Sequence, residues 1–285
     1  PALALTDHGV MHGAIEFYEE CEKQGIKPII GCEVYVAPRT LHDKVPRTDA
    51  HPYHLILLAK NERGYKNLMK LTSIAHIEGY YYKPRVDKKI LKKYSDGLIA
   101  CSACVQGEIV RKALEDIQKG RETIKEYLNI FGKENLYLEV QKHKMVPQQD
   151  EANELIFQLA KEFDLKVVAT NDIHYVNSDD DVAQDALICL QTSRVMSDTN
   201  RLSMVGDDYS MLSTETMLKN FPDHPEVVAN TLEVAEKCNL KLKLGEIIIP
   251  DFPVPEGHTL ATYFEEKAYL GLNWRYGTEK IKAKD

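Results

Sequence analysis

The 285-residue sequence predicts an α/β fold in which parallel strands alternate with helices. Three observations favour this class. Short runs of β-branched and apolar residues recur, segments with apolar residues at helical spacing follow them, and polar residues stand where the runs end. The alternation continues six times up to Tyr175, and it is typical of parallel strands joined by right-handed crossovers, in an open sheet or a closed barrel.

The expected elements follow in chain order. Strands are expected at 2–6, 28–36, 54–59, 97–102, 136–141 and 166–171. Helices are expected at 11–24, in about four turns after Ala59, over 107–131 as one or two helices, and at 148–163, 180–191, 223–238 and 258–276. The alternation stops after Tyr175, and the Ile- and Pro-rich residues 244–255 indicate an extended connector.

Composition and charge restrict the class of function. The chain has 36 basic and 44 acidic residues, and its net charge of −8 argues against a broad nucleic-acid-binding surface. That charge does not exclude a metal pocket that handles a single phosphodiester. The six scattered cysteines suit reduced thiols, and no run is long and apolar enough to span a membrane, so we expect a cytoplasmic protein. Because the chain begins at Pro1 inside an apolar run, we expect it to be a fragment.

Side chains with metal-ligand chemistry stand at or just after the predicted strands. They are Asp7, His8, Glu33, His54, Cys104, His143, Asp172 and His174. The carboxyl ends of parallel strands converge on one face, so we expect these groups to meet in one pocket. Imidazole, carboxylate and thiolate ligands together suit zinc, manganese or iron, and their number suggests more than one ion, as in clusters that split phosphate esters.

Each candidate also has a purely structural interpretation. His8 could only cap a helix, and His143 could be a surface residue in a Lys-rich turn. Glu33 lies within an apolar strand, where an unpartnered carboxylate is costly, so a ligand or ion-pair role is favoured. His54 fits a cluster least well, because it opens its strand. Asp172 and His174 are two apart, so an extended backbone would point both to one side.

Two further motifs allow more than one interpretation. Cys101 and Cys104 have the spacing of a redox pair, but on an extended backbone they face opposite ways, so we expect Cys101 in the core and Cys104 exposed. The loop at 80–85 is aromatic and basic. It could stack bases and hold phosphates, or it could be a packed surface loop.

Taken together, these motifs resemble the PHP (polymerase and histidinol phosphatase) superfamily. The matching segments are Thr6-Asp7-His8-Gly9, Gly31-Cys32-Glu33, His54-Leu55, Ser102-Ala103-Cys104 and Asn171-Asp172-Ile173-His174. More narrowly, the chain resembles the PHP domains of the alpha subunits of bacterial DNA polymerase III. That likeness rests on residues 61–68, 78–85, 137–141 and 253–257.

The resemblance implies a distorted (βα)7 TIM-like barrel whose first strand is missing from this fragment. Residues 1–250 would be the N-terminally truncated PHP domain, and 251–285 the connector and the start of the polymerase palm region. The implied metal ligands in this fragment are His8, Glu33, His54, Cys104, Asp172 and His174, part of a cluster that would hold up to three ions of zinc, manganese or iron in the intact domain. Asp7, His143 and Arg85 would support the cluster or contact substrate. The family's opening His-x-His motif, with an Asp shortly after it, would precede Pro1.

The resemblance also implies a function in replication. The full-length protein would be a DNA-directed DNA polymerase with its polymerase carboxylates beyond Asp285, and this part would be a metal-dependent phosphoesterase with 3′–5′ exonuclease activity. Its partners would be DNA and other holoenzyme subunits, including a proofreading subunit. One alternative is a scaffold that braces the polymerase and binds the proofreading subunit. Another is a free-standing phosphatase of the histidinol-phosphate type, which the loop at 80–85 and the connector argue against.

Overall fold

The computed structural model describes residues 1–247 and 249–277. The chain divides into two compact units, Pro1–Leu242 and Lys243–Asp285. The second unit begins with a segment that has no helix or strand among its described residues, followed by helix α10 (Leu260–Tyr276). The first unit ends before residue 250, and the division into a PHP domain and a palm region stays a prediction.

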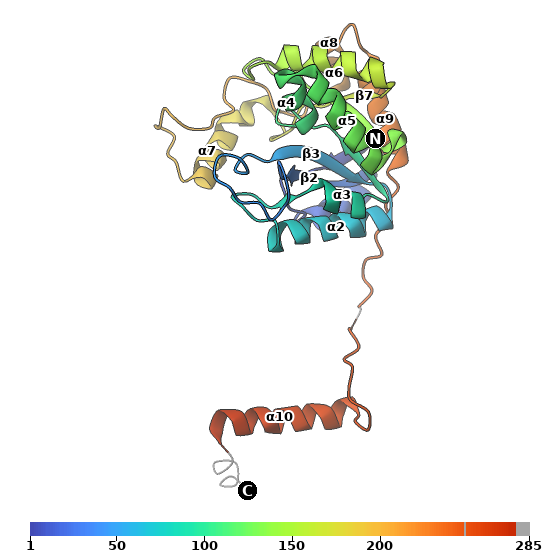
Figure 1. The fold of residues 1–285 in the computed structure, drawn as a ribbon, viewed down its shortest axis with the longest axis vertical. Helices are drawn as coiled ribbons and strands as arrows, with labels where there is room; N and C mark the ends of the chain where they lie inside the picture. The colour runs from blue at the N-terminus through green and yellow to red at the C-terminus, as the bar shows by residue number, and fades with distance from the viewer. Residues whose placement is uncertain (248, 278–285) are drawn as a thin grey trace. The chain divides into compact units, whose positions relative to one another are not determined.

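The first unit is built around one curled sheet that forms a half barrel (Figure 1). Its strands are β1 (Ala2–Leu5), β2 (Lys27–Val36), β3 (Tyr53–Ala59), β4 (Arg85–Val86), β5 (Leu98–Cys101), β6 (Leu136–Val140) and β7 (Val167–Ala169). The strand order is β1-β2-β3-β5-β6-β7, and the short β4 pairs with β2. The predicted strands are all present, and the half barrel agrees with the distorted barrel expected from the sequence.

The direction of β3 corrects the prediction of a wholly parallel sheet. β3 runs antiparallel to both β2 and β5, whereas β1–β2, β5–β6 and β6–β7 are parallel. A parallel neighbour needs a crossover, usually a helix, and residues 37–52 between β2 and β3 contain none. The start of β3 therefore lies at the same edge as the carboxyl ends of the parallel strands, and this places His54 opposite Tyr35 of β2.

α-Helices cover the sheet. In the first unit they are α1 (Ala14–Lys23), α2 (Glu62–Ile77), α3 (Lys88–Lys93), α4 (Glu108–Glu115), α5 (Ile117–Phe131), α6 (Gln149–Phe163), α7 (Asp181–Thr192), α8 (Thr214–Asn220) and α9 (Glu226–Lys237). The sequence did not predict β4, α3 or α8, because segments this short show too few turns or alternations for a period to be recognised. No helix among the described residues has both the length and the hydropathy to cross a bilayer.

The two faces of the sheet bury different sets of side chains. The outer face, with residues such as Leu55, Leu57 and Leu138, packs with helices α2, α4, α5 and α6 in the main core. The inner face carries a smaller apolar cluster: Ile29, Leu58, Ile99, Cys101, Tyr137 and Val168, together with Val234 and Cys238. Successive residues of a strand point to opposite faces of the sheet. Because both faces bury apolar side chains, the sequence of each strand is a nearly continuous apolar run.

Candidate metal centre

A cavity of about 820 Å³ lies on the inner face of the sheet and extends from β1 to β7. Its apolar wall includes Ile29, Ile56, Leu58 and Val168. Its polar wall is formed by Asp7, His8, Glu33, Cys104, Glu139, Gln141, Asp172 and His174. The structure therefore brings to one cavity most of the side chains that the sequence predicts for the site.

Glu33 is at the centre of the polar wall. The residue is 5% exposed, and its Oε1 lies 2.7 Å from Nδ1 of His54 and 2.9 Å from Nδ1 of His8. The antiparallel direction of β3 explains why His54 reaches this point from the start of its strand. His8 reaches it because the Gly9 N–H donates to the Glu33 carbonyl at 2.9 Å, which holds the end of β1 against β2.

Despite these short distances, Glu33 Oε1 has no hydrogen-bond partner among the described residues. Burial opposes ionisation of Glu33, but His54 and His8 outweigh burial and lower its pKa to about 2. The Glu33 carboxylate in turn raises the pKa of His8. The site therefore holds a buried, ionised carboxylate with a free acceptor position that faces two imidazoles.

Cys104 approaches the same group from the end of β5. Its Sγ lies 3.7 Å from Nδ1 of His54, and the Gln106 N–H donates to it at 3.5 Å. The turn that carries it passes through Ala103, whose φ is +61°, a conformation that L-residues adopt rarely. Burial raises the pKa of the Cys104 thiol. Cys101 is buried in the inner cluster as predicted, whereas Cys104 is only partly exposed and not exposed as expected, and all six cysteines are free.

Asp172 and His174 lie after β7, but their backbone is not the extended one that the spacing argument assumed. β7 ends at Ala169, and Asp172 has a φ of +47°. Their side chains are still close, with 3.8 Å between Asp172 Oδ1 and His174 Nδ1. The His174 ring lies 5.7 Å from the His8 ring, measured between centroids, so this pair adjoins the Glu33 group.

His143 is buried, so its interpretation as a surface residue is wrong. Its ring stacks on Tyr209 with centroids 4.2 Å apart, and Asp207 Oδ1 is 3.8 Å from its Nδ1. Neither ring nitrogen has a hydrogen-bond partner among the described residues, and burial lowers its pKa. Asp7 lines the cavity at the end of β1.

Arg85 lies away from this cavity. It is fully buried, and its guanidinium donates to the backbone carbonyls of Gly79, Asp49, Leu41 and Asp43. These four carbonyls are the hydrogen-bond partners of its side chain. The structure places it inside the loops of the first unit and brings no part of it to the Glu33 group.

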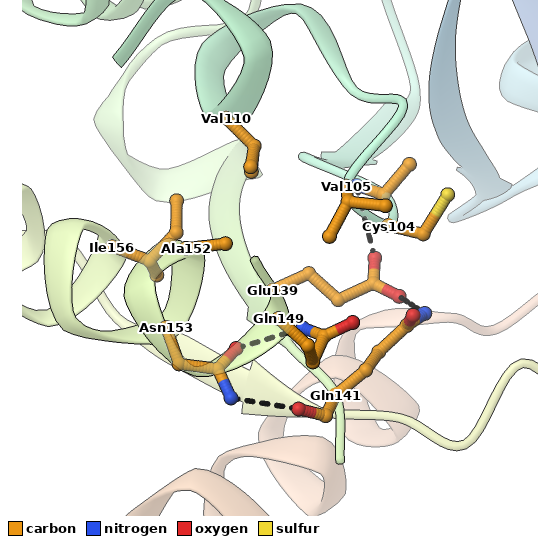
Figure 2. Close-up of a pocket in the computed structure, with 10 residues that line it drawn as sticks. Cys104, Val105, Val110, Glu139, Gln141, Gln149, Ala152, Asn153 and Ile156 are labelled. Atoms are coloured by element: carbon orange, nitrogen blue, oxygen red, sulfur yellow. Dashed lines mark hydrogen bonds between the residues drawn. The ribbon is translucent and has the colours of Figure 1, made fainter. Parts of the chain in front are cut away.

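Glu139 and Gln141 complete the polar wall, and they were not among the candidate site residues predicted from the sequence. Glu139 Oε2 accepts the Ala103 N–H at 3.1 Å, and its Oε1 accepts the Thr170 hydroxyl at 2.5 Å and the Gln141 amide at 3.3 Å. Figure 2 shows Glu139 between the Cys104 turn and Gln141, beside a small second cavity of about 10 Å³. Burial raises the pKa of Glu139 to about 7.

The alternation within β6 was the signal that could have identified this pair. Leu136, Leu138 and Val140 belong to the outer core, so Tyr137, Glu139 and Gln141 must face the other way. That is the face which carries Glu33 and the cavity.

The donor atoms suit a divalent cation in chemistry and spacing. Ligands about 2 Å from one ion lie roughly 3 Å from one another, and the separations around Glu33 and His54 range from 2.7 to 3.7 Å. The free Glu33 Oε1 is the acceptor that a cation would satisfy. In the described part of the chain, however, no three such side chains are arranged as a complete ion site.

The model of the PHP domain family matches residues 1–143, half of the chain. This chain belongs to the PHP domain family. PHP domains are generally metal-dependent, in agreement with the donor chemistry around Glu33.

Three curated relatives of this PHP domain are DNA polymerase III alpha subunits. The chain is 45% identical to the one from Borreliella burgdorferi, over 99% of this chain and 25% of that protein. It is 41% identical to the subunit from Treponema pallidum, over 99% of this chain and 24% of that protein. It is 39% identical to the subunit from Thermus aquaticus, over 97% of this chain and 23% of that protein. The chain thus spans about a quarter of the length of these relatives.

Proposed function

We propose that this chain is the PHP-domain region of a DNA polymerase III alpha subunit, and that its Glu33 cluster holds divalent metal for phosphodiester hydrolysis. The observation that carries the proposal is the buried, ionised Glu33, whose free Oε1 lies within 2.9 Å of two imidazole nitrogens. The similarity to polymerase alpha subunits supports the replicative role over that of a free-standing phosphatase. In that role the protein acts in the cytoplasm, with DNA and other holoenzyme subunits as partners.

In this proposal six side chains hold the metal. They are His8, Glu33, His54, Cys104, Asp172 and His174, which suit zinc, manganese or iron and would belong to a cluster of up to three ions in the intact domain. When bound, the metal supplies an activated water and stabilises charge that develops on the phosphate, giving a 3′–5′ exonuclease. Glu33, whose pKa is lowered to about 2, would receive the cation as an ionised carboxylate, and the Cys104 thiol, whose pKa is raised by burial, would have to release its proton to solvent to act as a ligand.

A structural role is the second candidate. No three donor side chains among those described are arranged as a complete ion site, and metal-dependent hydrolysis would depend on such a site. The domain would then stabilise the polymerase and bind a separate proofreading subunit.

The substitution Asp172→Asn in the full-length protein separates these candidates. It keeps the size of the side chain and removes a charge that would hold the metal. A nuclease should lose exonuclease activity by orders of magnitude and keep its polymerase activity and melting temperature. Equal loss of both activities with a lower melting temperature would favour the structural role. Asp179→Asn alters an exposed aspartate in the short 3-10 helix Ser178–Asp180 and controls for the loss of charge.

A further inference from the structure

The loop of residues 80–83, here called the aromatic-basic loop, presents two tyrosine rings to solvent. Tyr80 is 53% exposed and Tyr82 is 68% exposed. Tyr82 also has a φ of +58°, a left-handed conformation that bulky residues rarely adopt. The hydrophobic core therefore does not explain why this loop carries exposed rings in this conformation.

The aromatic-basic loop is held firmly beside His8. Tyr81 N–H donates to the Lys83 carbonyl at 3.0 Å, which closes the turn. Pro84 packs so tightly on Gly9 that a Cβ built on that glycine would lie 2.8 Å from the Pro84 ring. Gly9 follows His8 directly, so the exposed rings are fixed near the mouth of the candidate metal centre.

Lys83 supplies positive charge at this mouth. Its Nζ lies 5.5 Å from the centroid of the Tyr35 ring, which itself stacks on His8 at 6.3 Å and 15°. Lys83 makes no ion pair with any residue that the structure describes, whereas the cavity wall behind it contains Asp7, Glu33 and Asp172. A phosphate that approaches this otherwise acidic wall gains attraction from Lys83.

We propose that the aromatic-basic loop is a docking site for single-stranded DNA. Tyr80 and Tyr82 stack on unpaired bases near the 3′ end, and Lys83 contacts a backbone phosphate, so that the adjoining phosphodiester faces the Glu33 cluster. Exposed aromatic rings interleaved with a lysine have the chemistry of single-strand binding, which needs no sequence readout. A duplex does not offer its base faces to such rings. This inference rests on the proposed nuclease function, for which it names the substrate.

Photo-crosslinking in the full-length protein tests the contact locally, which matters because a polymerase binds DNA elsewhere as well. A single-stranded oligonucleotide with 5-iododeoxyuridine at its 3′ end is irradiated in EDTA, so that no cleavage occurs, and the linked residues are identified by mass spectrometry. We expect the link at Tyr80 or Tyr82. Tyr82→Ala should reduce the yield roughly tenfold, and Tyr82→Phe, which keeps the ring, should restore it. Links that all fall outside residues 80–83 would overturn the proposal.

The salt dependence of the same cross-linking tests Lys83. Lys83→Ala should lower the slope of log yield against log salt by about 1, as expected for one lost phosphate contact. Lys161→Ala, an exposed lysine on α6, is the matched control and should leave the slope unchanged. An unchanged slope in Lys83→Ala would show that Lys83 does not contact a phosphate at this site.

The docking site and the nuclease can fail separately. Cross-links at the tyrosines without cleavage in the presence of divalent metal would keep the docking site and refute the hydrolytic function. Metal-dependent cleavage that Tyr82→Ala leaves at the wild-type rate, with no link at the loop, would refute the docking site alone.

Discussion

Arg85 has no exposed surface, and the carbonyls that surround its guanidinium come from separate segments of the chain. The oxygens belong to Gly79, Leu41, Asp43 and Asp49. The sequence motif around Arg85 suggested a substrate contact, but motif spacing does not report burial. The fork of the guanidinium suits several carbonyls at once, which a lysine cannot reproduce.

Arg85→Ala should reduce the free energy of unfolding by about 3–5 kcal/mol, because buried carbonyls lose their donors and a cavity remains. The stability of Arg85→Lys should lie between that of the wild type and that of Arg85→Ala, because lysine keeps the charge but not the forked guanidinium. Urea denaturation measures both. Arg63→Ala removes an exposed arginine whose ion pair with Asp96 spans 3.4 Å, and it should change stability by less than about 1 kcal/mol. A similar loss in Arg63→Ala and Arg85→Ala would contradict this account.

Glu139 predicts a pH dependence of the metal-free protein. Burial raises its pKa from 4.5 to about 7, so between these values the folded state keeps a proton that the unfolded state releases. Stability should therefore fall as pH rises through this window, by on the order of 3 kcal/mol in all. The glutamine of Glu139→Gln does not titrate, so the stability of this variant relative to the wild type should increase as pH rises. Urea denaturation of both proteins at about pH 5 and about pH 8 gives the comparison.

Glu154→Gln is the matched control, because Glu154 is an exposed glutamate on α6. Its stability difference from the wild type should be nearly the same at both pH values, because an exposed glutamate has no buried proton to release. If the difference between Glu139→Gln and the wild type is the same at both pH values, the buried carboxylate does not titrate in this window.

At the scale of elements, the sequence predicted where strands occur but not all of their directions. β2 and β3 were recognisable as apolar runs, yet nothing in either run shows that the two are antiparallel. Only the absence of a helix between them carried that information. Because the direction of β3 was not predicted, His54 was expected to fit the site poorly. The start of β3, which carries His54, in fact lies at the site. Likewise, the residues after β7 looked extended, but Asp172 adopts a left-handed conformation that no periodicity predicts.

A close approach between α2 and the turn before β5 gives a prediction at this scale. A Cβ built on Gly64 would lie 1.9 Å from the Gly97 carbonyl oxygen, so Gly64→Ala must separate the helix from this turn. We expect a loss of about 2–3 kcal/mol, measured by urea denaturation. Gly271→Ala in α10 meets no atom within 4 Å and should instead add about 0.5–1 kcal/mol to helix stability. A loss of under 0.5 kcal/mol in Gly64→Ala would show that the turn moves freely.

At the scale of the whole molecule, the sequence predicted an α/β fold and the convergence of polar side chains at the strand ends, and the family resemblance implied a distorted barrel. The sequence could predict this convergence because strand ends in such folds share one edge. It could not predict the environment of each group, which depends on packing between distant segments. Glu139 and the buried His143 show this, since Ala103, Thr170 and Tyr209, which surround them, lie far from them in sequence.

Cobalt(II) binding by the full-length protein tests the central claim, that the Glu33 cluster holds a divalent cation through Cys104. The wild type should bind cobalt and show a thiolate-to-cobalt charge-transfer band. Cys104→Ser should lose that band, whereas Cys101→Ala, which alters a buried core cysteine, should retain it. Absence of the band from the wild type, or its persistence in Cys104→Ser, would contradict the metal centre described here.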